Sequence, residues 1–403
     1  MRTNKQDIKL SDHSCNYKFN EKSVHLNLID AYIPSMNILI ITRHFPSSHS
    51  GRYAWLKPLS EAFVSLGHNC AVIAPVDIKK DLHIYKFRRE FQCPDGKRFT
   101  VLRPLFLFTR FRKRAIERAI RHCGFVPDCI YGQFWSAAYH CYGYASAHNI
   151  PLFVNCGESD VQRLTARYTH NEDWNKFCKY VTGIICVSEK NREECIDGGF
   201  ADAAKCLVAA NGVNRDVFKP MNRRECRERL GLPQDVFIVS FVGHFNNRKG
   251  VVRLSKAISR IRDANISSIF IGKGDETPDC PGILFCGEAA HDTVATYLNA
   301  SDIFVLPTLN EGCSNAIVEA ICCGLPVISS ARSFNQGILD DSNAILIDPE
   351  NIDEIALAIK TLKENTGSRQ RMAQAAIQKS ESLSVIRRAE KILAFIEENL
   401  LSA

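Results

Sequence analysis

The stretch IFVLPTLNEGCSNAIVEAICCGLPVIS, residues 303–329, predicts a strand, a loop, a short helix and a second strand. It begins with a β-branched, apolar run and returns to one at Val327, a pattern typical of buried strands. Ser314 or Asn315 can cap the helix between these runs, and Gly324 can end it. This order of elements predicts one repeat of an α/β domain built around a buried sheet.

Two glutamates stand eight positions apart in this stretch, Glu311 in the predicted loop and Glu319 on the predicted helix. A helix N-terminus offers unpaired N–H groups and the positive end of a dipole, so the backbone of Ser314, Asn315 and Ala316 suits a phosphate. The two carboxylates are then left for neutral hydroxyls, and the site suits a nucleotide-sugar. The alternative for such a pair of acids is a surface loop followed by an ordinary helix glutamate.

The same segment resembles the Glu-x7-Glu signature of the family 4 glycosyltransferases, and the flanking residues 300–307 and 323–328 match as well. Further blocks from Met36 onward extend the resemblance over most of the chain. Members of that family are retaining enzymes of the GT-B fold. The resemblance therefore implies an α/β protein with two Rossmann-like, doubly wound parallel-sheet domains that face each other across a cleft. It implies a donor nucleotide on the second domain, an acceptor on the first, and hinge closure around both.

The chain has 403 residues, of which 24% are charged and 45% apolar, as expected for a globular protein with room for two domains. No apolar run approaches the ~18 residues of a membrane helix, and the N-terminus lacks a signal-peptide pattern, so we expect a cytoplasmic protein. Many of the 17 cysteines fall in apolar patterns, and we expect them to be reduced and buried. No Cys-x2-Cys pair occurs in the sequence, and we expect neither a metal nor a cofactor.

The chain divides into four predicted parts. Residues 1–35 are polar and irregular, and we expect either that they are a non-native extension with Met36 as the functional initiator, or that they are a disordered extension. Alternating β-rich and helical runs predict a Rossmann-like acceptor domain at 36–215 and a nucleotide-sugar domain at 216–385. In this fold the last helix, at 386–403, is expected to cross back onto the first domain. The predicted strands are 38–42, 70–74, 129–131, 152–155, 183–187 and 206–209, then 237–242, 268–271, 283–285, 303–306, 326–329 and 344–347.

Residues 243–250 follow a predicted buried strand and precede a helix, so cations in this loop would face a diphosphate. The loop resembles the family's Gly-Arg…Lys-Gly element, whose cations neutralise the leaving group. Lys249 matches the lysine, whereas His244 stands where arginine is usual. Either His244 or Arg248 can supply the second positive charge, and the sequence ranks neither; a leaving diphosphate without such partners would raise the barrier by several kcal/mol. The alternative is a solvated turn.

Several glycines match positions where the family's backbone approaches the donor, namely Gly272, Gly274 and Gly287 in the second domain. In the first domain, Gly51 corresponds to a glycine loop near the donor phosphates and the acceptor. His49 beside it is a candidate acceptor contact, with a plain turn as the alternative. Backbone readout leaves little trace in side chains, so we expect a UDP-, GDP- or ADP-sugar without naming the base.

Glu158 lies where many relatives carry a His-Gly-Ser-Asp element, and Gly157 takes the position of the histidine. The resulting Gly-Glu-Ser variant resembles transferases of bacterial surface-polysaccharide pathways, which implies a glycan or lipid-linked acceptor. Glu158 can bond sugar hydroxyls or orient the acceptor. The alternative is a structural partner for a neighbouring cation.

The segment from Lys86 to Arg121 carries twelve basic side chains against three acidic ones, more than the whole net charge of +7. Phe106, Phe108 and Phe111 interleave the cations. We expect peripheral contact with an anionic membrane surface, to which each cation contributes about 1 kcal/mol. A solvated helix face is the alternative; nucleic acid is not expected, because no recognition motif accompanies the charge.

Taken with the resemblance, these residues predict a metal-independent, retaining hexosyltransferase in surface-polysaccharide or lipopolysaccharide biosynthesis. The resemblance implies that Glu311 contacts the donor sugar and Glu319 the ribose, while Lys249 with His244 or Arg248 binds the diphosphate. A sugar-nucleotide epimerase of the same fold and a non-catalytic nucleotide-sugar-binding subunit are the alternatives.

Overall fold

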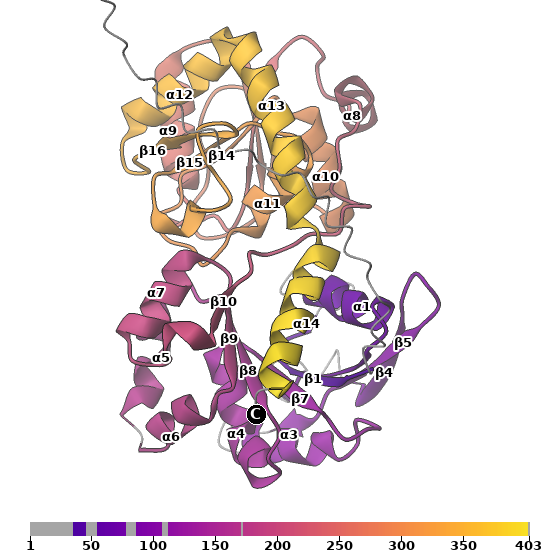
Figure 1. Cartoon of the computed structure of the whole chain (residues 1–403). Helices are drawn as coiled ribbons and strands as arrows, with labels where there is room; N and C mark the ends of the chain where they lie inside the picture. Colours follow the sequence, from indigo (N-terminus) through magenta and orange to yellow (C-terminus); the bar gives the residue numbers. More distant parts are fainter. Residues whose placement is uncertain (1–34, 46–54, 78–85, 107–111, 171, 402–403) are drawn as a thin grey trace, which may run out of the picture. The chain divides into compact units, whose positions relative to one another are not determined.

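The computed structural model describes residues 35–45, 55–77, 86–106, 112–170 and 172–401 (Figure 1). Residues 1–34 of the predicted extension lie outside this part of the chain. The same is true of the candidate residues His49 and Gly51, and of Phe108, Arg110 and Phe111 in the basic segment.

The first half of the described chain forms an eight-stranded sheet in the order β10-β9-β8-β7-β1-β2-β5-β4. All neighbouring pairs are parallel except β4 and β5. The strands are β1 (Asn37–Ile41), β2 (Asn69–Ile73), β4 (Arg88–Gln92), β5 (Arg98–Leu102), β7 (Cys129–Gln133), β8 (Leu152–Cys156), β9 (Gly183–Cys186) and β10 (Cys206–Val208). A pair of two-residue strands, β3 (Val76–Asp77) and β6 (Leu105–Phe106), lies apart from this sheet.

Helices cover both faces of this sheet, which is why β1 is apolar at four successive positions. Ile38 and Ile40 belong to one buried cluster, and Leu39 and Ile41 to another, because successive side chains point to opposite faces. The helices are α1 (Leu56–Ser65), α3 (Arg112–Ile120), α4 (Trp135–Ala147), α5 (Val161–Thr169), α6 (Glu172–Tyr180) and α7 (Glu189–Asp197).

A second, wholly parallel sheet has the order β13-β12-β11-β14-β15-β16 among the described residues. Its strands are β11 (Phe237–Val242), β12 (Ile266–Ile271), β13 (Ile283–Gly287), β14 (Ile303–Leu306), β15 (Val327–Ser330) and β16 (Ala344–Ile347). Its helices are α8 (Arg223–Leu230), α9 (Val251–Ile261), α10 (His291–Ala300), α11 (Asn315–Cys322), α12 (Ile352–Glu364) and α13 (Thr366–Ser380).

The last helix, α14 (Val385–Leu401), packs against α1 and the first sheet (Figure 1). Its buried residues Ala389, Ile392 and Ile396 belong to the same apolar cluster as Ile38 and Ile40. The chain thus passes between the sheets twice. The two passes run side by side, since the backbone N–H of Val213 donates to Leu383 O and that of Val385 donates to Val213 O, each at 3.0 Å.

The basic segment does not form one helix face. Its residues are distributed over β4, β5, β6 and α3, and the β4–β5 hairpin is absent from the predicted strands. Arg103 and Phe106 are buried, so neither can contact a membrane surface. Phe106 instead packs beneath the Arg112 guanidinium, 4.8 Å from the ring centre. Among the described residues, no helix has both the length and the apolar character needed to cross a bilayer.

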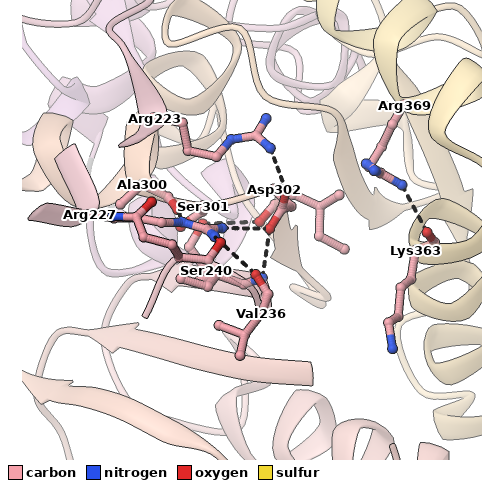
Figure 2. Close-up of polar contacts among 12 residues, drawn as sticks. Arg223, Arg227, Val236, Ser240, Ala300, Ser301, Asp302, Lys363 and Arg369 are labelled. Carbon is pink, nitrogen blue, oxygen red and sulfur yellow. Dashed lines mark hydrogen bonds and ion pairs between the residues drawn. The ribbon is translucent and has the colours of Figure 1, made fainter. Parts of the chain in front are cut away.

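A buried carboxylate holds the amino ends of the second sheet together (Figure 2). Asp302 precedes β14 and accepts three bonds, from Arg223 Nη1 at 2.6 Å, Arg227 Nη2 at 2.8 Å and the Ile238 backbone N–H at 2.8 Å. Arg227 also donates to the backbone oxygens of Ala300, Gln234 and Val236. This network ties α8, β11 and β14 at the edge of the sheet opposite its ligand-binding carboxyl ends.

Asp302→Ala is expected to lower the free energy of unfolding by about 3–5 kcal/mol, because it leaves the buried Arg227 charge without a counter-ion. Urea denaturation monitored by circular dichroism measures the loss. Arg223→Ala is the matched control: its side chain is 52% exposed, so its pair with Asp302 contributes about 1 kcal/mol at most. Equal losses in the two variants would contradict this role for the buried pair.

Candidate functional site

The candidate residues gather at the carboxyl ends of β11 and β14. Strand order runs outward in both directions from this pair, toward β12 on one side and β15 on the other. Such a switch point leaves a crevice between the loops that follow the two strands, and ligands of open α/β sheets bind there. Residues 243–250 follow β11, and residues 307–314 follow β14.

Glu311 is the centre of the site. Its side chain is only 9% exposed, and its Oε1 accepts from Lys249 Nζ at 2.6 Å, Arg248 Nη1 at 2.8 Å and Thr308 Oγ1 at 2.8 Å. Burial alone would raise the pKa of Glu311, but the charges of Lys249 and Arg248 outweigh it and hold the pKa below its usual value. The carboxylate is therefore ionised at neutral pH.

The two loops around Glu311 are joined by further bonds. Arg248 Nη1 also donates to Asn310 O at 2.6 Å, and the Leu309 N–H donates to Arg248 O at 2.8 Å. Gly250 has a φ of +79°, and a Cβ there would lie 2.5 Å from Pro307 O. A glycine is required at this position because the loops approach so closely.

The N-terminus of α11 faces the site without a side-chain cap. Ser314 occupies the N-cap position, yet its hydroxyl makes no cap bond, and its buried oxygen has no partner among the described residues. Asn315 is held in place by Asn211, whose Nδ2 donates to Asn315 Oδ1 at 2.8 Å. The N–H groups of the first turn are thus left for a ligand.

A cavity of about 510 Å³, here called the first cavity, lies between this helix end and α1. From the first domain it is lined by residues that include Lys57 and Glu61. Seven predicted site residues line it from the second domain, namely His244, Lys249, Glu311, Ser314, Asn315, Ala316 and Glu319.

The glycines Gly272, Gly274 and Gly287 do not line the first cavity. A Cβ on Gly272 would lie 1.8 Å from Gly243 O, and one on Gly274 would lie 2.0 Å from Phe245 O. The first two glycines therefore allow the loop after β12 to pack against the loop after β11. The contact that the structure shows for these two glycines is a close approach of backbone to backbone, and their predicted approach to the donor stays a prediction.

His291 is a site residue that the sequence analysis missed. At the start of α10, its Nε2 lies 3.0 Å from Glu319 Oε1 on the wall of the first cavity. The hydrogen bond to Glu319 raises the pKa of His291 above its usual value, although partial burial opposes the shift. A lone histidine at a helix start carries no sequence pattern that points to this pairing.

Arg388 on α14 is the other side chain that the sequence analysis missed. It is buried, and its Nη2 donates to Asn155 Oδ1 at 2.8 Å while its Nη1 donates to Asn211 Oδ1. Asn211 in turn bonds Asn315 and Cys313 O. The crossing helix therefore helps to position the N-terminus of α11.

A second cavity of about 540 Å³ adjoins the first, and the two share Glu311 and Cys313 as lining residues. Glu158 is buried in its wall, where Oε1 accepts from the Trp135 N–H at 2.8 Å and Oε2 from the Gly157 N–H at 3.0 Å. Burial raises the pKa of Glu158 well above its usual value. The carboxyl is held by two backbone donors, one at the start of α4 and one just after β8, and no ion pair to a described residue accompanies it.

Beside this cavity, the loop after β14 packs closely on the loop after β8. A Cβ on Gly312 would lie 2.7 Å from Gly157 O and 2.9 Å from Glu158 O. Only a glycine at 312 allows the loop after β14 to pack so closely on the loop after β8. Arg248 lines the second cavity and His244 the first, so the two cations left unranked by sequence lie on different sides of Glu311.

Three buried thiols gather near Glu158. The sulfurs of Cys156, Cys186 and Cys195 lie within 4.8 Å of one another, in an apolar cluster that also contains Trp135 and Phe177. Burial raises the pKa of Cys156, which favours the neutral thiol. We read the group as small apolar packing residues, as expected from the sequence.

Both halves of the chain match family models of known proteins. Residues 54–217 match the family model for glycosyltransferase family 4, and residues 222–379 match that for glycosyl transferases group 1. A Bacillus subtilis protein named as a teichuronic acid biosynthesis glycosyltransferase is 26% identical over 351 residues, covering 80% of this chain and 88% of the relative. The UDP-Gal:alpha-D-GlcNAc-diphosphoundecaprenol alpha-1,3-galactosyltransferase of Escherichia coli is 30% identical over 199 residues, covering 45% of this chain and 51% of the relative.

Solved structures show the same architecture at low identity. Sucrose-phosphate synthase from Thermosynechococcus elongatus superposes with a TM-score of 0.72 at 17% identity, covering 91% of this chain and 100% of that one. Anabaena HepE, in complex with UDP and glucose, gives a TM-score of 0.71 at 17% identity, covering 90% and 100%. The predicted GT-B fold is confirmed. The chain belongs to the glycosyltransferases of group 1 and family 4.

Proposed function

We propose that this transferase moves a sugar from a nucleotide-sugar to a glycan or lipid-linked acceptor, with retention of anomeric configuration. One observation carries the proposal: an ionised Glu311, the Lys249 ammonium and the uncapped N-terminus of α11 line a single cavity. The cavity thereby combines a carboxylate that can accept hydrogen bonds from sugar hydroxyls with positive charge at a helix N-terminus that can bind an anion. A sugar joined to a diphosphate needs both.

The donor diphosphate is proposed to lie against the first-turn N–H groups of α11 and the Ser314 hydroxyl. Lys249 supplies a positive charge beside it, and His244 is preferred over Arg248 as the second cation because it lines the same cavity. Glu319 would accept from the ribose hydroxyls. No group in this assignment requires a metal ion or a bound cofactor.

The bond-breaking step is proposed to depend on the leaving group. The acceptor hydroxyl attacks the anomeric carbon on the face from which the diphosphate leaves, and a phosphate oxygen takes its proton. No dedicated protein base is then needed. All three bonds to Glu311 from described residues end on Oε1, which leaves Oε2 for a hydroxyl of the donor sugar.

The pathway is proposed from the relatives. One is named for teichuronic acid biosynthesis and another for transfer to a diphosphoundecaprenol-linked sugar, so surface-polysaccharide biosynthesis at the cytoplasmic face of a membrane suits this chain. Arg88 and Arg89 on the exposed edge strand β4, with Arg114 and Arg118 on α3, are the cations proposed to contact anionic lipid. We do not expect nucleic acid as a partner.

Release of nucleoside diphosphate from a panel of UDP-, GDP- and ADP-sugars separates the proposal from its alternatives. Diphosphate formed only in the presence of an acceptor supports transfer. An isomerised donor without acceptor would identify an epimerase, and binding without any turnover would identify a non-catalytic subunit. The same panel names the base and the sugar.

Glu311→Gln and Lys249→Ala are each expected to lower the rate of transfer by about 10²–10³-fold. The first removes the charged group that accepts from a donor-sugar hydroxyl, and the second removes a cation beside the leaving diphosphate. Steady-state kinetics with the donor found in the panel measures the loss. Lys273→Ala is the matched control, since this exposed lysine lies in the loop after β12 and pairs with Glu288 outside the first cavity. Unchanged turnover in both site variants would refute the assigned roles.

His291→Gln is expected to raise the donor KM several-fold while changing kcat little, because His291 positions Glu319 and does not touch the reacting atoms. In the unmodified protein the donor KM should rise with pH. The pKa of His291 is raised, so its charge is present below the ordinary value near 6.5 and is lost as pH rises through the higher folded value. A pH profile of KM that is the same in the variant would contradict this positioning role.

A further inference from the structure

The second cavity contains more positive charge than the transfer of a neutral sugar requires. Four arginines line it: Arg43, Arg163, Arg167 and Arg248. They come from the end of β1, from two turns of α5 and from the loop after β11, so three separate segments direct guanidinium groups to one space. Guanidinium groups stay charged at any physiological pH.

Two of these arginines have no counter-ion within the described part of the chain. No carboxylate there lies within ion-pair distance of Arg43 or Arg167, and Arg167 instead lies over the Tyr168 ring, 4.7 Å from its centre. Arg163 has only a 3.6 Å contact with Asp160 through its Nε, and its side chain is 75% exposed. Such a contact holds the guanidinium weakly.

The acidic residues of the cavity do not balance this charge. Glu311 is already engaged by Lys249 and Arg248, and the raised pKa of Glu158 favours its neutral form. The positive charge also affects the pKa of a neighbouring histidine, His140. Burial lowers the pKa of His140, and the charges of Arg112, Arg43 and Arg167 lower it further.

We propose that the second cavity binds an oxyanion carried by the acceptor, a phosphate or a carboxylate, and that Arg43, Arg167 and Arg163 are its ligands. The inference rests on the proposed function, because it takes the first cavity to be the donor site. A guanidinium fork forms two parallel bonds to either oxyanion, and a cleft lined by one sign of charge concentrates the opposite sign. Since the cavities share Glu311, an anion held here keeps the acceptor beside the donor sugar.

Binding of simple anions tests the site without turnover. Inorganic pyrophosphate, glucose 1-phosphate, glucuronate and glucose are titrated calorimetrically into the full chain carrying Lys249→Ala, which weakens the donor site. Adding Arg43→Gln and Arg167→Gln should weaken anion binding at least tenfold and leave glucose unaffected. Adding Arg229→Gln and Arg371→Gln instead, which removes the same charge from exposed positions outside both cavities, should change nothing.

The anions also distinguish the two sources of negative charge. Preference for glucose 1-phosphate and pyrophosphate assigns a phosphorylated acceptor, and preference for glucuronate assigns an acidic sugar. An equal loss of anion binding in the cavity double variant and in the control double variant would show only a general charge effect and overturn the proposal. So would unchanged binding in the Arg43 and Arg167 variant.

Transfer kinetics give a second, independent measurement. Once the donor is known, the Arg43→Gln, Arg167→Gln variant should raise the KM for an anionic acceptor at least tenfold, with the donor KM unchanged. A phosphorylated acceptor and its neutral counterpart used equally well by the unmodified chain would overturn the inference. Absence of nucleoside diphosphate release with every donor would instead refute the proposed function, while the calorimetric result would still decide whether the cavity binds anions.

Discussion

The buried carboxylate of Glu311 and its two cations form the contact on which the site depends. Lys249 and Arg248 come from the loop after β11, and Glu311 from the loop after β14, so their bonds fix the two loops relative to each other. A buried charge without a partner is strongly unfavourable, so loss of the two cations would destabilise the buried Glu311 carboxylate. The N-terminus of α11 follows Glu311 by four residues and is positioned by the same loop.

The site is also fixed from the first domain. Arg388 on α14 bonds Asn155 and Asn211, and Asn211 holds Asn315 at the start of α11. Gly312 packs on the backbone around Gly157, where any side chain would separate the loops. The first and second cavities are therefore two spaces around one carboxylate, and the proposed donor and acceptor contacts meet at Glu311.

Local patterns in the sequence predict all six strands of the second sheet, six of the eight strands of the first, and most side chains of the first cavity. Features that depend on distant contacts were not predicted. The β4–β5 hairpin lies in a segment whose charge hides its alternation, and Phe106 is buried although its neighbours are cationic. The packing of Gly272 and Gly274 against the backbone of a neighbouring loop is likewise a contact that no local pattern predicts.

What the sequence determined by itself is the α/β repeat, the family and the candidate cations and carboxylates, since periodicity, helix capping and short motifs are properties of neighbouring residues. Only the tertiary structure decided which groups meet. It paired His291 with Glu319, put His244 and Arg248 in different cavities, and gathered the arginines of the second cavity. The bond between Arg388 and Asn155 joins residues 233 positions apart. Packing of whole elements sets such contacts, and no local pattern encodes them.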